Sequence, residues 1–320
     1  MTPYPYEREI DVVVRVVRHA ALATEAIRKK DLKILEKGDG TPVTQADIVS
    51  QAIILAGIEA NFPEDAVSAE EVLEAGEKET LRAAAVCFLK DLNLSREASH
   101  LEERVNYRGN PGGKRIWMVD PIDGTKGFRK GLGYAVAVGL YEGGRPRLGV
   151  MGLPRFAGGK GNPPGMVTAY GAEGRGAYVL EGAGDAPRRI HVSRRKDVSR
   201  LRIVGSRAHD RVDICGRFAR ETGAPDVVHM DSMAKYLMVA SGRADLYLKV
   251  SDPDFGIAFP WDHCAGQVLL EEAGGRVTGL AGEPLNYEQR EGSPIRDTDG
   301  LVASNGACHE EALAIIESLG

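Results

Sequence analysis

Several carboxylates in the sequence lie at expected turns or helix starts, and two of them, Asp120 and Asp123, lie close to each other. Asp120 and Asp123 lie three residues apart in the segment Asp-Pro-Ile-Asp-Gly-Thr, which follows an apolar stretch at residues 117–119. Proline and glycine restrict the geometry of such a bend, so the two carboxylates are forced together and repel each other. A divalent cation would relieve that repulsion. An ordinary surface turn uses the same residue types, so the bend alone leaves both interpretations open.

Acidic residues from three other segments favour the metal site. These are Asp47, the adjacent pair Glu70 and Glu71, and Asp262. Each has a simpler alternative: Asp47 fits a capping box with Thr44, Asp262 fits a helix N-cap, and one of the two glutamates can be merely solvated. We expect only one glutamate to bind metal directly. Acidic residues in four separate segments are nevertheless better explained by a binding site for a hard cation than by coincidence.

The types of ligand available indicate the metal. Carboxylate and carbonyl oxygens suit Mg²⁺, and the sequence has no cluster of histidine and cysteine that would indicate zinc. His263 follows Asp262 directly, and we interpret it as a structural neighbour of the site rather than a ligand. The four cysteines show no C-x-x-C spacing, which argues against a disulfide framework and fits a reducing, intracellular setting.

Length and charge limit the classes of function. A chain of 320 residues can form two domains or one large layered domain. Its net charge of -5 gives no indication of a nucleic-acid or anionic-membrane partner. We find no apolar run of membrane length and no leader pattern at the N-terminus. The expected location is the cytoplasm, with a processed organellar protein as the alternative, and the expected partner is a small molecule. Oligomeric state stays open, with a monomer among the possibilities.

The pattern of expected elements changes near residue 195. Before it, helical periodicity at residues 7–30 and after Thr44 is followed by strands, including an expected hairpin around Gly143 and Gly144. After it, strands and helices alternate. The expected strands are residues 201–204, 227–230 and 245–249, and the expected helices are residues 212–221 and 232–241. We therefore predict an α+β domain at residues 1–195 and an α/β domain at residues 196–320, with the metal site between them.

These motifs together resemble the lithium-sensitive, magnesium-dependent phosphomonoesterases typified by inositol monophosphatase. The resemblance covers roughly residues 7–320 and rests on the acidic motifs together with the segment Trp-Asp-His-Cys-Ala-Gly at residues 261–266. It implies a layered αβαβα sandwich of the sugar-phosphatase type. One departure is Ala69, which stands where the family usually has glycine. A positive φ at that position would strain the end of the strand.

Within this superfamily the chain is most similar to the 3'(2'),5'-bisphosphate nucleotidases, which remove the 3'-phosphate from adenosine 3',5'-bisphosphate. The similarity rests on three segments: residues 126–128 (Lys-Gly-Phe), residues 206–210 (Ser-Arg-Ala-His-Asp) and residues 230–236 (Met-Asp-Ser-Met-Ala-Lys-Tyr). A phosphatase of inositol monophosphate or inositol 1,4-bisphosphate is the first alternative. A nucleotide sensor without catalysis is a more remote alternative, because every expected carboxylate is present.

The resemblance implies a role for each candidate residue. The implied metal ligands are Glu70, Asp120, the carbonyl of Ile122, Asp123 and Asp262. The implied catalytic pair, which would handle the attacking water, is Asp47 and Thr125. The expected substrate contacts are Gly124, Thr125, His209, Ser232, Lys235 and Lys249. The last stands where relatives often have arginine, so its contact with phosphate or base is open, because lysine lacks the planar fork of arginine.

These roles predict two or three Mg²⁺ ions, with Asp120 as the shared ligand. In two-metal sites one ion activates the attacking water while the other stabilises the leaving oxygen. We expect the Thr125 hydroxyl to bond Asp47 and to orient that water. Position alone favours structural roles for two of the substrate residues, since Ser232 fits a helix N-cap and Lys235 fits a helix surface. Only the resemblance favours substrate contact there.

Overall fold

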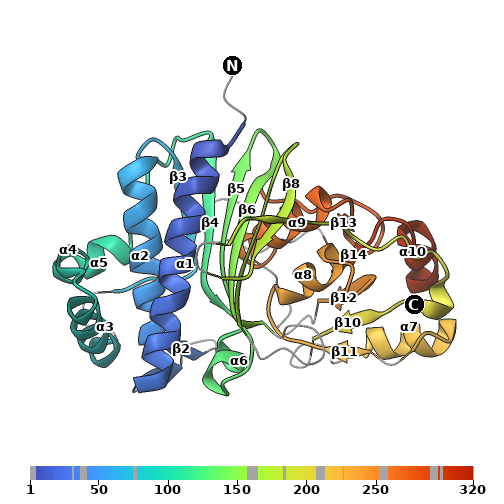
Figure 1. Cartoon of the computed structure of the whole chain (residues 1–320), viewed down its shortest axis with the longest axis horizontal. Coiled ribbons are helices and arrows are strands. Elements are labelled where there is room, and N and C mark those ends of the chain that lie inside the picture. Colours follow the sequence, from blue (N-terminus) through green and yellow to red (C-terminus); the bar gives the residue numbers. More distant parts are fainter. Residues whose placement is uncertain are drawn as a thin grey trace.

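The computed structural model arranges helices and two large β-sheets in layers, with a small two-stranded sheet beside them (Figure 1). It describes residues 5–30, 32–36, 42–74, 78–156, 165–182, 185–206, 213–225, 227–251, 259–288, 295 and 298–319. No helix within these ranges is both long enough and apolar enough to cross a lipid bilayer.

Two long helices, α1 (Glu7–Lys30) and α2 (Gln45–Asn61), form the first layer. The short hairpin of β1 (Ile34–Glu36) and β2 (Pro42–Thr44) leads into α2. Thr44 caps α2, because its hydroxyl oxygen accepts the N–H of Ala46 at 3.1 Å and its own N–H donates to Asp47 at 2.8 Å. The capping box predicted for Asp47 is thereby confirmed.

Three shorter helices pack on α2. They are α3 (Glu79–Asp91), α4 (Ser95–Ser99) and α5 (Leu101–Val105).

The larger sheet has seven strands whose spatial order follows the chain. The strands are β3 (Ala66–Ala69), β4 (Arg115–Asp123), β5 (Ala135–Glu142), β6 (Arg145–Phe156), β7 (Gly165–Ala172), β8 (Gly176–Leu180) and β9 (Arg188–Ile190). Only β3 and β4 pair in parallel, and every other neighbouring pair is antiparallel. Glu142 pairs with Arg145, so the predicted hairpin is confirmed.

Alternation along β4 separates two cores. Trp117 and Val119 belong to the core shared with α1 and α2, whereas Met118 belongs to the core on the opposite face. This second core also contains apolar residues of α8 (Ala234–Ala240) and α9 (Cys264–Glu272). Both faces of the larger sheet are therefore covered by helices.

The smaller sheet has the strand order β11-β10-β12-β14-β13. The strands are β10 (Ile203–Gly205), β11 (Val228–His229), β12 (Leu246–Val250), β13 (Arg276–Thr278) and β14 (Gly300–Ser304). The expected alternation after residue 201 is confirmed through β12. The antiparallel strands β13 and β14 were not predicted, and neither was the last helix, α10 (His309–Leu319).

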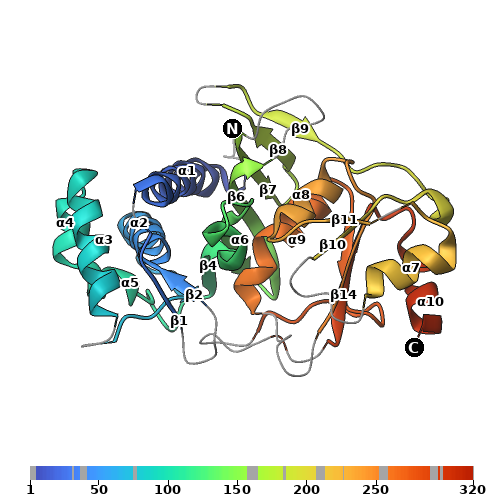
Figure 2. The same cartoon turned by 90° about the horizontal axis from the view of Figure 1, so that it is seen from below.

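Figures 1 and 2 show five layers: α1 and α2, the larger sheet, α8 and α9, the smaller sheet, and finally α7 (Ile214–Thr222) with α10. A third apolar core lies between the smaller sheet and this outermost helix layer. The predicted αβαβα sandwich is confirmed.

Close packing of α9 on the larger sheet brings the two halves of the chain together. A Cβ atom at Gly149 of β6 would lie 2.2 Å from the carbonyl oxygen of Ala265, so a side chain there would push α9 away. The short 3₁₀ helix η2 (Pro260–Asp262) directly precedes α9 and contacts β4 and β5. Asp262 is thereby held against the carboxyl end of β4.

Candidate metal and substrate site

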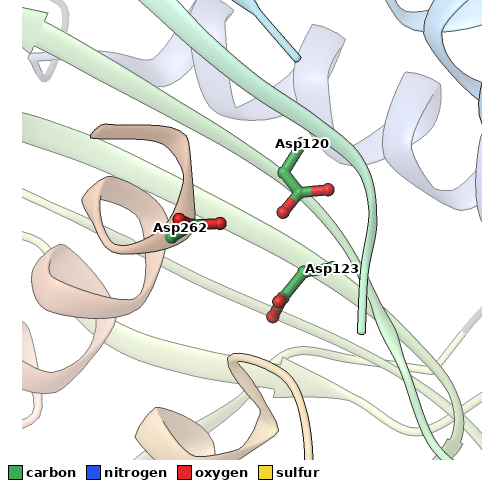
Figure 3. A group of neighbouring side chains, drawn as sticks. All are labelled: Asp120, Asp123 and Asp262. Carbon is green, nitrogen blue, oxygen red and sulfur yellow. The ribbon is translucent and has the colours of Figure 1, made fainter. Parts of the chain in front are cut away.

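Three carboxylates from two distant segments form a cluster. Asp120 and Asp123 lie on β4, and Asp262 lies at the end of η2 (Figure 3). One oxygen from each side chain lies within 4.8 Å of one oxygen from each of the other two. The structure thus brings together three of the five expected metal ligands by their side chains.

The cluster is electrostatically strained without a cation. Burial raises the pKa of Asp120 well above its ordinary value, and the neighbouring carboxylates raise it further. Burial also raises the pKa of Asp123, against the opposing charge of Lys235. For Asp262, burial raises the pKa to about 6, and Lys249 opposes the effect. A divalent cation among these oxygens would favour their ionised forms.

One oxygen of the cluster is available to a ligand. Asp120 Oδ1 is buried and has no hydrogen-bond partner among the described residues. A buried polar atom without a partner is costly, and a hard cation would satisfy it. Glu70, the fourth expected side-chain ligand, lies beside this group and is hydrogen-bonded to Asp120. The donor set therefore fits Mg²⁺.

Glu70 and Glu71 make different contacts. Glu71 is buried, pairs with Lys78 at 3.7 Å and has its backbone held by Gln51 from α2. Gln51 and Asp47, which both lie near Glu71, belong to α2, so Glu71 faces the helix layer. Ala69 lies in β3 and is absent from the residues with positive φ, so the strain considered for this position does not occur.

Asp262 is not the N-cap residue of α9, in contrast to the interpretation from its position in the sequence. The residue at the N-cap position of α9 is His263, and Asp262 instead closes the preceding 3₁₀ turn, where its Oδ2 accepts the N–H of Phe259 at 2.7 Å. His263 is buried, and its Nδ1 lies 2.9 Å from the hydroxyl oxygen of Tyr236. Burial lowers the pKa of His263 well below its ordinary value.

The expected hydrogen bond between Thr125 and Asp47 is not formed, although both residues are described. The Thr125 hydroxyl donates instead to the carbonyl of Ile122 at 3.0 Å. Threonine readily bonds a carbonyl three residues earlier, and the tight turn makes this acceptor available. Asp47 Oδ2 accepts from Thr44, while its Oδ1 is buried with no hydrogen-bond partner in the described part of the chain. Burial raises the pKa of Asp47 well above its ordinary value.

The turn after β4 contacts the second half of the chain directly. Gly124 has φ +89°, and a Cβ atom there would lie 3.1 Å from Cβ of Ser232. Ser232 is itself left-handed, with φ +69°, and its hydroxyl accepts the N–H of Ala234. The N–H of Met233 donates to Asp123. A hydrogen bond thus joins the start of α8 to the carboxylate cluster.

Lys235 is buried, contrary to the helix-surface interpretation. Its side chain is 5% exposed, its Nζ donates to the carbonyl of Ser232 at 2.7 Å, and it lies 5.1 Å from the ring centre of Tyr247. Burial lowers its pKa to about 8, against the opposing charge of Asp123. The charge of Lys249 on β12 also acts on the cluster, since it lowers the pKa of Asp262 against the effect of burial.

Some parts of the site had no signal in the sequence. The hydrogen bond to Asp123 is donated by the backbone N–H of Met233, and the sequence does not indicate it because every residue except proline has this group. The bond between Tyr236 and His263 joins residues 27 positions apart. His209, predicted to contact the substrate, lies outside the described residues.

Comparison with known proteins identifies the family. The model of the "Inositol monophosphatase family" matches residues 6–320. This chain belongs to the inositol monophosphatase family. The family resemblance stated from the acidic motifs is therefore confirmed.

Curated relatives cover nearly the whole chain. A "3'(2'),5'-bisphosphate nucleotidase 1" of Candida albicans is 30% identical and covers 99% of this chain and 97% of its own length. A "Probable 3'(2'),5'-bisphosphate nucleotidase 4" of Arabidopsis thaliana is 31% identical over 94% of this chain and 91% of its own length. Among solved structures, an IMPase of Thermotoga maritima covers 98% of both chains, with a TM-score of 0.67 and 21% identity. That structure supports the fold.

Proposed function

We propose that this chain is a Mg²⁺-dependent phosphomonoesterase that removes the 3'-phosphate of adenosine 3',5'-bisphosphate and releases it as inorganic phosphate. The sulfated form of this nucleotide, adenosine 3'-phosphate 5'-phosphosulfate, is a second proposed substrate. The observation that carries the proposal is the similarity over nearly the full length to curated 3'(2'),5'-bisphosphate nucleotidases, at 30–31% identity. The cluster of three carboxylates supports it independently, since oxygen ligands of this kind suit Mg²⁺.

In this proposal most of the metal ligands come from the first half of the chain, and Asp262 comes from the second. Two or three Mg²⁺ ions would be held by Glu70, Asp120, the Ile122 carbonyl, Asp123 and Asp262. When bound, the ions neutralise phosphate charge and make water a better nucleophile. Lithium sensitivity is expected with the same ligand set.

Two side chains would handle the attacking water. The Thr125 hydroxyl can turn from the Ile122 carbonyl toward water, because a hydroxyl rotates freely between acceptors. Asp47 has a buried oxygen with no hydrogen-bond partner among the described residues, and this oxygen can accept the proton. Burial, with the nearby charge of Glu71, raises the pKa of Asp47, and this direction favours proton acceptance.

Substrate contacts would come from both halves of the chain, with the nucleotide selected by the second half. Backbone N–H groups of Gly124 and Thr125 would contact the transferred phosphoryl group. Ser232, Lys235, Lys249 and His209 would contact the nucleotide. Lys235 supports this assignment best, because its buried ammonium lies near the carboxylate cluster, where it could attract a phosphate of the substrate.

Phosphate release tests the reaction. We expect the purified protein to release phosphate from adenosine 3',5'-bisphosphate in Mg²⁺ and to stop when the metal is chelated. The same assay with inositol 1-phosphate and inositol 1,4-bisphosphate tests the family's other substrates. A preference for an inositol phosphate would overturn the nucleotidase assignment. Calorimetric binding of the nucleotide without Mg²⁺-dependent turnover would indicate a sensor instead.

Substrate selection has its own test. Lys235→Gln should raise the KM for adenosine 3',5'-bisphosphate at least about tenfold, a loss of roughly 1.4 kcal/mol in binding. Lys130→Gln is the matched control, because Lys130 is exposed and follows the short helix α6 (Thr125–Arg129). Equal KM values for the two variants would argue against a substrate contact at Lys235.

A further inference from the structure

Tyr236 on α8 and His263 at the start of α9 form a hydrogen bond between the two helices that lie between the sheets. The Tyr236 hydroxyl oxygen lies 2.9 Å from His263 Nδ1, and both side chains are buried. The Tyr236 ring also packs on Gly266, where a Cβ atom would lie 2.3 Å from the ring. The contact therefore holds α8 and α9 at a fixed distance and fixes the orientation of the imidazole.

Each partner adjoins a residue of the site. Lys235 directly precedes Tyr236, and Asp262 directly precedes His263. The start of α8 already contacts the carboxylate cluster through the N–H of Met233. The hydrogen bond thus joins the segment with the expected substrate contacts to the segment that supplies the third carboxylate.

The imidazole has few other constraints. His263 Nε2 is buried and has no hydrogen-bond partner within the described ranges. Among described residues, the Tyr236 hydroxyl is therefore the only hydrogen-bond partner of the ring. The Tyr236 hydroxyl thus ties the His263 side chain to α8, and the backbone of His263 continues directly from Asp262.

We propose that the Tyr236–His263 hydrogen bond is a positioning element that holds Asp262 in the geometry that binds Mg²⁺ and links metal binding to the start of α8. The inference rests on the proposed function, since it uses Asp262 as a metal ligand. Tyr236 and His263 act through Asp262 and need not touch the metal or the substrate. Loss of the hydroxyl should therefore weaken metal binding while the fold persists.

The test is a calorimetric titration of the full chain with Mg²⁺ alone. Tyr236→Phe removes the hydroxyl and keeps the ring on Gly266, so we expect the dissociation constant for Mg²⁺ to rise about 2- to 12-fold, the range of one net hydrogen bond. At saturating Mg²⁺, kcat should return close to that of the unmodified protein. Tyr287→Phe is the matched control, because it removes a buried hydroxyl that donates to Gln267 at 2.6 Å in the same core without joining α8.

Variants of His263 separate the hydrogen bond from general packing. His263→Asn keeps a polar atom close to the position of Nδ1 and should restore part of the Mg²⁺ affinity that His263→Leu loses. Combining Tyr236→Phe with His263→Leu should weaken binding no further than His263→Leu alone.

The outcomes distinguish the inference from the function on which it rests. Unchanged Mg²⁺ affinity in Tyr236→Phe would overturn the positioning role, and so would an equal loss in Tyr287→Phe. Absence of Mg²⁺ binding by the unmodified protein would overturn the proposed function itself, and the positioning role with it. Thermal unfolding of each variant shows whether the fold is retained.

Discussion

Replacing Asp120 by asparagine should stabilise the metal-free protein while abolishing its Mg²⁺-dependent turnover. Oxygens of the three clustered carboxylates lie within 4.8 Å of one another, and at an effective dielectric constant of about 20 each ionised pair repels by about 3.5 kcal/mol. Asp120 takes part in two such pairs. Asparagine removes the charge with little change in volume, so the repulsion is relieved without a cavity.

Proton uptake limits the size of this effect. Protonating a carboxyl group with an ordinary pKa of 3.8 at pH 7.5 costs about 5 kcal/mol. A repulsion larger than this cost would be relieved by protonation of the carboxyl group, so the gain in the free energy of unfolding cannot exceed about 5 kcal/mol. Relief of a single pair sets the lower end, and the expected gain is about 3 to 5 kcal/mol. For 320 residues the unfolding entropy is about 0.7 kcal/mol per kelvin, so the Tm should rise by about 4 to 7 °C.

Thermal unfolding in chelator and then in Mg²⁺ provides the assay. Mg²⁺ should raise the Tm of the unmodified protein and have little effect on Asp120→Asn. The control is Asp245→Asn, where a buried carboxylate pairs with Arg202 at 2.8 Å and the same substitution should lower the Tm. A lower Tm for metal-free Asp120→Asn, or equal stabilisation of both proteins by Mg²⁺, would refute the reasoning.

Three further predictions concern the scaffold. Burial lowers the pKa of His309 from 6.5 to about 4, so between these two pH values the unfolded chain binds a proton that the folded chain does not. The free energy of unfolding should therefore fall by up to about 1.4 kcal/mol per pH unit as the pH drops from 6.5 toward 4. Denaturant unfolding at several pH values should show a shallower fall for His309→Gln. Thr44→Ala should lower the free energy of unfolding by about 1 kcal/mol through loss of the α2 cap, and Thr44→Ser should not, by urea denaturation. Gly266→Ala should lower the Tm by several degrees, because the new methyl group overlaps the Tyr236 ring, whereas Gly165→Ala has open space and should leave the Tm unchanged.

Local patterns predicted the elements that carry the site. The three-residue spacing from Thr44 to Asp47 predicted the capping box, because both partners lie within one turn of helix. The apolar run before Asp120 predicted β4, and the paired glycines 143 and 144 predicted the hairpin. In each case the interacting groups are close in sequence, so residue types and spacing contain the information.

Predictions that depended on distant contacts were less successful. The helix position of Lys235 by itself favoured a surface location, although the resemblance implied a substrate contact; in the structure Lys235 is buried and lies against the ring of Tyr247. Thr125 was expected to reach Asp47, yet the nearer carbonyl of Ile122 takes its hydrogen bond. Neither outcome is encoded in local spacing.

The sequence by itself determined the residue types of the site, the family and the order of most elements, because these follow from short motifs and local periodicity. The tertiary structure alone decided that Asp262 lies within 4.8 Å of Asp120 and Asp123, that the start of α8 donates a backbone N–H to Asp123, and that Tyr236 holds His263. These contacts join residues more than 25 positions apart. They depend on how closely α8 and α9 pack between the two sheets, which is set by the shape of the whole core.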